Sequence, residues 1–120
     1  MSVRPEDLAK TMMDRHRERR CALDRRADEL RERVVAEVRA ILAEGRARQA
    51  WIIGSLAWGG FDVRSDVDLV FEGVGADALD SLWARLSERL QLEPDVLRLE
   101  ELSDDFRERV LAQGMAIDVA

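Results

Sequence analysis

Three aspartates and a glycine–serine pair are the residues of this chain whose types and spacing suit chemistry. Asp66 and Asp68 stand at positions i and i+2 of an apolar segment, and such side chains point to the same face of a strand. Two neighbouring carboxylates repel each other unless a cation lies between them. A hard ion such as Mg2+ prefers carboxylate oxygens and keeps sites for water or phosphate. The pair therefore predicts a magnesium site, and a solvated acidic strand edge is the alternative.

The glycine–serine pair lies at the end of another predicted strand, residues 50–53. Gly54 would let the backbone approach a ligand closely, and the Ser55 hydroxyl beside free backbone N–H groups suits a phosphate. Ser55 could instead be the N-cap of a short following helix, and the two roles are compatible. A phosphate-binding turn opposite a metal-binding strand predicts transfer of a nucleotidyl group.

Asp95 is the third candidate. It follows Pro94 in a predicted strand over residues 93–99 that is otherwise largely apolar, where an unpaired carboxylate is costly. A role as a further metal ligand, or as general base for an acceptor hydroxyl, would explain it; capping of a turn after the proline is the alternative. We expect Asp95 to complete the catalytic and metal-binding group.

The segment GSLAWGGFDVRSDVD, residues 54–68, resembles the signature of the DNA polymerase β-type nucleotidyltransferase superfamily. It is most similar to the minimal members, the small MNT proteins of prokaryotes. The resemblance extends to the strand carrying Asp95 and to a closing helix and glycine over residues 106–114. It implies an α/β fold of the polymerase β type, with Mg2+ as cofactor and ATP as substrate.

One position departs from that pattern. Many members of the superfamily carry arginine where this chain has Trp58, and that arginine would help to neutralise phosphate charge. We expect Arg64, two residues before Asp66, to contribute to nucleotide binding in its place. An exposed loop arginine without such a role is the alternative.

The resemblance also implies a partner. MNT proteins are commonly encoded beside HEPN-type ribonuclease toxins and act as antitoxins that add AMP to a toxin tyrosine. This chain contains no tyrosine, so it cannot be its own tyrosine substrate. The expected function is therefore that of a Mg-dependent protein adenylyltransferase acting on a HEPN toxin. The alternatives are a non-catalytic antitoxin that acts by complex formation, and a dimeric small-molecule nucleotidyltransferase.

Charge and composition limit the ligands, partners and cellular location to be expected. Residues 1–50 carry 13 basic and 10 acidic groups, a balance of +3, while residues 51–120 carry 6 and 15, a balance of -9. An acidic catalytic region favours metal binding and argues against direct nucleic-acid binding. The single cysteine excludes an internal disulfide and fits the cytoplasm. No apolar run has the length of a membrane span, so no membrane partner is expected.

A long helix and a short sheet must position these residues. No proline or glycine interrupts the chain from Pro5 to Glu44, which predicts a helix unless the charged stretch over residues 14–22 bends it. We divide the chain into a helical extension, residues 1–27, for contact with a partner or a second copy, and a nucleotidyltransferase domain, residues 28–120. The domain is predicted as a short mixed sheet flanked by helices. The apolar stripe of the helix consists of Leu23, Ala27, Leu30, Val34, Val38 and Ile41.

Overall fold

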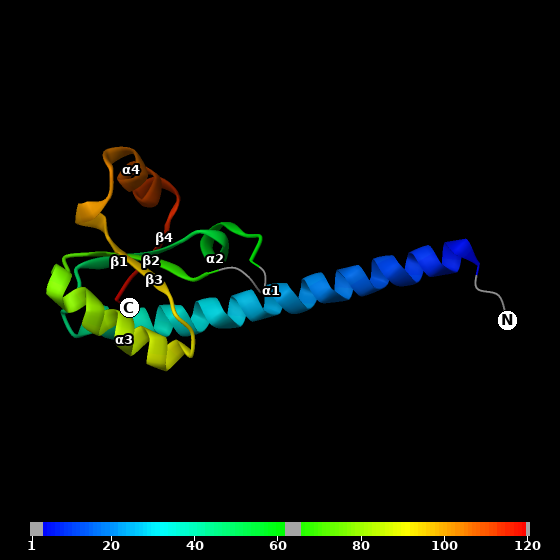
Figure 1. Ribbon diagram of the computed structural model, residues 1–120, viewed down its shortest axis with the longest axis horizontal. Coiled ribbons are helices and arrows are strands. Elements are labelled where there is room, and N and C mark those ends of the chain that lie inside the picture. The colour runs from blue at the N-terminus through cyan, green and yellow to red at the C-terminus, as the bar shows by residue number, and fades with distance from the viewer. Residues whose placement is uncertain (1–3, 62–65, 120) are drawn as a thin grey trace.

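The computed structural model describes residues 4–61 and 66–119 and has the predicted α/β architecture (Figure 1). The sheet is short, and a long helix precedes it. In chain order the elements are α1 (Pro5–Ala43), β1 (Gln49–Ile53), α2 (Ser55–Trp58), β2 (Asp68–Glu72), α3 (Ala76–Leu90), β3 (Asp95–Arg98), the 3-10 helix η1 (Leu99–Glu101), α4 (Asp104–Gln113) and β4 (Met115–Ile117).

The four strands form one mixed sheet in the order β3-β2-β1-β4. Strand β1 is antiparallel to both β2 and β4, whereas β2 and β3 are parallel. The register pairs Ile53 with Asp68 and Asp68 with Asp95. The end of β1 and the starts of β2 and β3 therefore meet at one edge of the sheet, where the predicted site residues lie.

The two faces of the sheet are covered differently. Helices α1 and α3 lie on one face and α4 lies on the other (Figure 1). The face under α1 and α3 forms the larger core, in which the central side chains are completely buried: Val34, Val38, Ile41, Ile52, Leu69, Phe71 and Leu86. Each such side chain contributes about 1.5–3 kcal/mol when it leaves water. The face under α4 and η1 holds a smaller cluster of Trp51, Ile53, Val70, Leu99 and Val110.

Helix α1 is a single uninterrupted helix of 39 residues, so the charged stretch over residues 14–22 does not break it. Its buried residues all lie between Ala27 and Leu42, and residues 5–22 are exposed. The N-terminal half therefore projects from the rest of the molecule (Figure 1). With this projection the molecule measures 66 × 31 × 24 Å. No helix in the described part of the chain is long and apolar enough to cross a membrane.

Some element boundaries differ from the prediction. Strand β2 begins at Asp68, so Asp66 precedes the strand, because the partner strand β1 ends at Ile53 and offers no further pairing. The predicted third strand is shorter, since η1 takes over at Leu99. The last helix, α4, is capped at its start: the Ser103 hydroxyl accepts a hydrogen bond from the Phe106 N–H at 3.3 Å.

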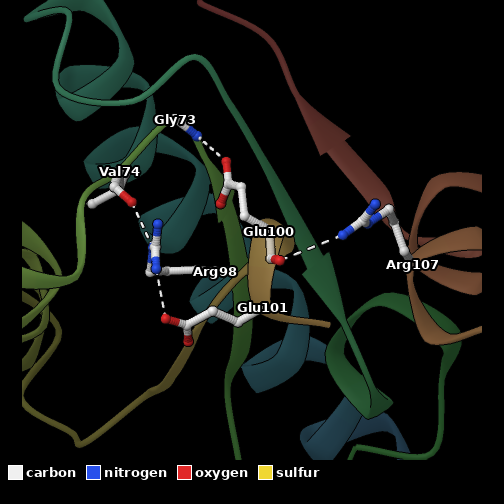
Figure 2. Close-up of polar contacts among 6 residues, drawn as sticks. All are labelled: Gly73, Val74, Arg98, Glu100, Glu101 and Arg107. Carbon is white, nitrogen blue, oxygen red and sulfur yellow. Dashed lines mark hydrogen bonds and ion pairs between the residues drawn. The ribbon is translucent and has the colours of Figure 1, made fainter. Parts of the chain in front are cut away.

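A group of polar contacts attaches η1 to the turn after β2 (Figure 2). The Gly73 N–H donates to Glu100 Oε1 at 2.7 Å, and Arg98 Nε donates to the Val74 carbonyl at 2.7 Å. Arg107 of α4 donates to the Glu100 carbonyl at 3.4 Å. Because these bonds join three segments, they hold α4 over its face of the sheet despite the small apolar cluster beneath it.

Candidate active site

Asp68 and Asp95 form the centre of the candidate site. They are register partners at the starts of the parallel strands β2 and β3. Burial raises the pKa of Asp68 from its ordinary 3.8 to about 6, and the negative charge of Asp95, a hydrogen bond between the two carboxyls and the negative charge of Asp66 add to the shift. The structure thus places two of the predicted carboxylates at paired positions of neighbouring strands, and the third two residues before β2.

Asp66 is exposed and lies in the segment that leads into β2; Asp95 is exposed as well, so of the three only Asp68 is partly buried. Within residues 4–61 and 66–119, no group of three or more His, Cys, Asp or Glu side chains is arranged to hold a metal ion. Mg2+ commonly takes only one or two protein carboxylates and completes its shell with water and substrate phosphates. The oxygen donors and mutual repulsion of Asp68 and Asp95 therefore fit such an ion, and ligation by all three aspartates stays a prediction.

Gly54 lies directly against the carboxylate pair. Its backbone has φ 75° and ψ -157°, a conformation that is essentially confined to glycine. A Cβ at this position would lie 2.5 Å from Asp68 Oδ2. The absence of a side chain is therefore required both by the backbone conformation and by the closeness of the turn to Asp68.

Ser55 is the first residue of α2, and Gly54 is its N-cap. The alternative interpretation of Ser55 as an N-cap is therefore wrong, because the N-cap position is occupied by Gly54. The short helix starts with hydrogen bonds from the Ala57 and Trp58 N–H groups to the Gly54 carbonyl, at 3.1 and 2.9 Å. Phosphate binding by Gly54 and Ser55 stays a prediction.

Arg31 of α1 fixes α2 from one side. Its Nε and Nη2 both donate to the Leu56 carbonyl, at 2.9 and 2.7 Å, while Nη1 donates to Asp28 at 2.8 Å. A guanidinium with its planar set of donors suits this double bond to one carbonyl. The Leu56 side chain itself is fully buried. Arg31 therefore couples the long helix to the turn that carries Gly54.

Trp58 fixes α2 from the other side. Its Nε1 donates to the Gln113 carbonyl at the end of α4, at 2.6 Å, and the Arg109 guanidinium lies 5.1 Å from the centre of its ring. A cation in this position is attracted to the face of an indole ring. Trp58 thus joins the glycine–serine turn to α4, in the place where the resembling family carries arginine.

These supporting residues could not be found from the sequence. Arg31 and Leu56 are 25 residues apart, and Trp58 and Gln113 are 55 apart, so only the folded chain brings them together. Arg64, predicted to bind nucleotide, lies outside the described residues. On the α1 side of Asp66 there is a cavity of about 310 Å³ lined by Leu30, Phe61, Asp66, Val67, Leu92 and Glu93.

Comparisons with known proteins place the fold. No protein-family model and no curated protein matches the chain. Among solved structures, the chain is similar to a provisionally assigned minimal nucleotidyltransferase, with 26% identity and a TM-score of 0.63 over 74% of this chain and 93% of that one. It is also similar to a chain of a toxin–antitoxin crystal structure with AMP-PNP, with 19% identity and a TM-score of 0.61 over 72% and 73% of the two chains.

The class of fold follows from these similarities. The four-stranded mixed sheet of this chain and its covering helices superpose on a structure described as a minimal nucleotidyltransferase with a TM-score of 0.63. The chain therefore has the nucleotidyltransferase fold that the segment over residues 54–68 predicts. The long N-terminal helix stands in front of this fold.

Proposed function

We propose that this chain is a Mg2+-dependent nucleotidyltransferase that transfers AMP from ATP to a tyrosine of a partner HEPN ribonuclease toxin and so neutralises the toxin. The observation that carries the proposal is the pairing of Asp68 with Asp95 at the starts of β2 and β3, with the Gly54 turn directly against Asp68. That arrangement puts two carboxylates that favour a cation beside a glycine turn whose backbone comes close to Asp68. It is the equipment that nucleotidyl transfer needs, because such catalysis is mainly positioning and charge neutralisation.

The proposed roles follow from the positions of the side chains. Asp66, Asp68 and Asp95 hold Mg2+, which, when bound, neutralises the charge that grows on the leaving pyrophosphate. Gly54 and Ser55 bind the terminal phosphates through backbone N–H groups and the hydroxyl, and Arg64 assists them. Asp95, at the start of β3, also accepts the proton of the acceptor hydroxyl.

The bond changes balance in one step. The tyrosine oxygen bonds to the α-phosphorus of ATP, the bond from that phosphorus to the β-phosphate bridging oxygen breaks, and pyrophosphate leaves. The hydroxyl proton passes to Asp95. The tyrosine must come from a partner, since this chain has none.

The comparisons support the partner as well as the chemistry. One similar structure is described as a toxin–antitoxin with AMP-PNP, an ATP analogue, and the other as a minimal nucleotidyltransferase. A nucleotide analogue in a toxin–antitoxin structure of this fold is what an antitoxin that uses ATP would display. The acidic balance of the domain fits a protein acceptor better than a nucleic acid.

The test is the intact mass of the partner HEPN protein after incubation with this chain, Mg2+ and ATP. We expect a gain of one or more AMP units with the wild-type chain and none with Asp68→Asn. Asp80→Asn is the matched control, because Asp80 is an exposed carboxylate on α3 away from the site, and it should leave the transfer unchanged. An unmodified partner with the wild-type chain would contradict the proposal.

A second candidate is a binding antitoxin without turnover. The observation in its favour is the exposed N-terminal half of α1, which offers a contact surface that catalysis does not need. A chain with both Asp68→Asn and Asp95→Asn separates the two candidates. If binding alone neutralises the toxin, this variant still protects cells. Loss of protection in that variant, with the complex intact, would favour the enzyme.

A further inference from the structure

The projecting part of α1, residues 5–26, which we call the arm, lacks the contacts that normally stabilise a helix. At about 1.5 Å per residue it is roughly 33 Å long. In proteins, most of the stability of a helix comes from the packing of an amphipathic face rather than from intrinsic propensity. The one ion pair within the arm among the described residues joins Arg20 and Asp24 at 3.6 Å, both half exposed, and such pairs contribute little. The arm therefore needs a surface to pack against.

One face of the arm is suited to such packing. Met12 and Met13 are 62% and 63% exposed, and with His16, Arg17 and Arg20 they line a hollow of about 460 Å³. At roughly 100° per residue this hollow lies on the same side of α1 as the stripe that enters the core further along. The packing face of α1 thus continues onto the arm, where nothing in the described part of the chain covers it.

The charge of the arm is opposite to that of the rest of the chain. Residues 5–26 hold 7 basic and 5 acidic groups, a balance of +2, and residues 27–120 hold 11 and 20, a balance of -9. Since residues 27–50 are balanced at 5 and 5, the whole negative excess comes from the domain beyond α1. A second copy of this chain therefore presents the surface charge that the arm would attract.

Helix α4 offers the complementary face. Asp104, Glu108 and Leu111 are spaced four and three residues apart and so share one side of the helix. All three are exposed, Leu111 by 54%, and neither acid forms an ion pair with another described residue. A groove of about 240 Å³ runs beside Leu111, lined also by Glu72, Leu99, Glu100 and Arg107.

Two other acids nearby already have partners within the chain. Figure 2 shows Glu100 bonded to the Gly73 N–H and Glu101 paired with Arg98. Asp104 and Glu108, on the same side of α4 as Leu111, remain available for a cation from outside, and so does the exposed Asp105 beside them. The combination of Asp104 and Glu108 with Leu111 matches the methionines and arginines of the arm in both apolar and charged character.

We propose that the arm of one copy docks on the α4 face of a second copy, with Met12 and Met13 against Leu111 and Arg17 and Arg20 beside Asp104 and Glu108. Two copies that exchange their arms form a closed, two-fold dimer, in which both arms and both α4 faces are covered. This interaction is independent of the proposed enzymatic function, because neither surface includes Asp68, Asp95 or Gly54.

Sedimentation of the full chain over a range of concentrations tests the dimer. We expect a species of twice 13.7 kDa whose dissociation constant rises as salt is raised from about 0.1 M to about 1 M, because screening weakens attraction between exposed charges. Arg17→Glu with Arg20→Glu should weaken the dimer roughly tenfold or more, because it sets like charges against each other. A chain that is monomeric at every concentration would overturn the proposal and leave the arm to a different protein.

A charge exchange tests the location. Asp104→Arg with Glu108→Arg should weaken the dimer as much as the arm variant does, and the chain that carries all four changes should dimerise again. Arg15→Glu with Arg25→Glu is the matched control, since both residues point away from the hollow, and it should leave the dissociation constant unchanged. Failure of the fourfold variant to dimerise, or an equal loss in the control, would overturn the pairing of the arm with α4.

Discussion

The two faces of the sheet differ in how deeply they are buried and in what they carry. Under α1 and α3, Leu69 and Phe71 of β2 are completely buried among aliphatic side chains. On the opposite face, Val70 of the same strand is buried under α4, but Asp68 two residues earlier is only half covered. One strand therefore supplies the larger core with Leu69 and Phe71, the smaller cluster with Val70 and the candidate site with Asp68.

This difference shows how a small domain can accommodate a repelling pair of carboxylates. The face under α1 and α3 holds the larger apolar cluster, and Asp68 and Asp95 lie together at the edge of the sheet on the face that holds the smaller one. A cost remains, because burial and neighbouring charges make the ionised form of Asp68 unfavourable. Substitutions on the two faces should accordingly separate stability from function.

The largest effect on stability should come from the face of the sheet under α1 and α3. Phe71→Ala removes a completely buried ring and leaves a cavity, which costs about 3–5 kcal/mol of unfolding free energy. Urea unfolding followed by tryptophan fluorescence measures this loss. A change below about 1 kcal/mol would mean that this face is not the main core.

Gly54→Ala should lower both the stability of the fold and the rate of nucleotidyl transfer. The alanine would be held in a backbone conformation that costs about 1–3 kcal/mol, and its Cβ would meet Asp68 Oδ2 at 2.5 Å. We expect nucleotidyl transfer to fall by roughly 100-fold, because the turn must move away from the carboxylates. Gly45→Ala is the matched control: Gly45 has φ 74° and nothing within 4 Å of an added Cβ, so it tests backbone strain without the contact.

Asp68→Asn should abolish transfer and yet stabilise the protein at neutral pH. The pKa of Asp68 is about 6 in the folded chain against an ordinary 3.8, so the folded state holds its proton more tightly. The resulting stabilisation is complete below pH 3.8 and is lost as pH rises through about 6. After allowance for solvent screening of this half-covered group, we expect the wild type to lose about 1 kcal/mol relative to the variant across that window.

Thermal unfolding of both proteins at several pH values checks this prediction. The difference between wild type and Asp68→Asn isolates the one group, since all other titrations are shared. If the two curves run parallel from pH 3.8 to above 6, the Asp68 carboxyl is not perturbed and the contact with Asp95 is wrong.

The smallest effect should come from the hydrogen bond by which Trp58 joins α2 to the end of α4. Trp58→Phe keeps the ring but removes the Nε1 hydrogen bond to the Gln113 carbonyl, a loss of about 0.5–1.5 kcal/mol. Because this hydrogen bond orients α2, we also expect a severalfold lower rate of nucleotidyl transfer. Trp83→Phe on α3, which removes a comparable bond to the Pro94 carbonyl at 2.9 Å, should match the loss in stability.

Much of this arrangement was predictable from local sequence patterns. The alternation of Leu69, Val70 and Phe71 predicts a strand, and the spacing of the glycine–serine pair from Asp66 and Asp68 predicts the site. Asp66 was placed on the strand because its neighbours are strand formers, but pairing ends where β1 turns at Gly54. The bonds of Arg31 and Trp58 were unpredictable, since their partners are far away in sequence and are backbone carbonyls, which carry no sequence signal.

The most direct test of the account is calorimetric titration of ATP into the full chain with and without Mg2+, for the wild type and for a chain with both Asp68→Asn and Asp95→Asn. The account predicts that the wild type binds ATP at least about tenfold more tightly when Mg2+ is present, because the carboxylate pair repels free triphosphate and attracts the metal complex. It predicts no such dependence in the double variant. Equal dependence on Mg2+ in the two chains would contradict the assignment of Asp68 and Asp95 as the metal-binding centre.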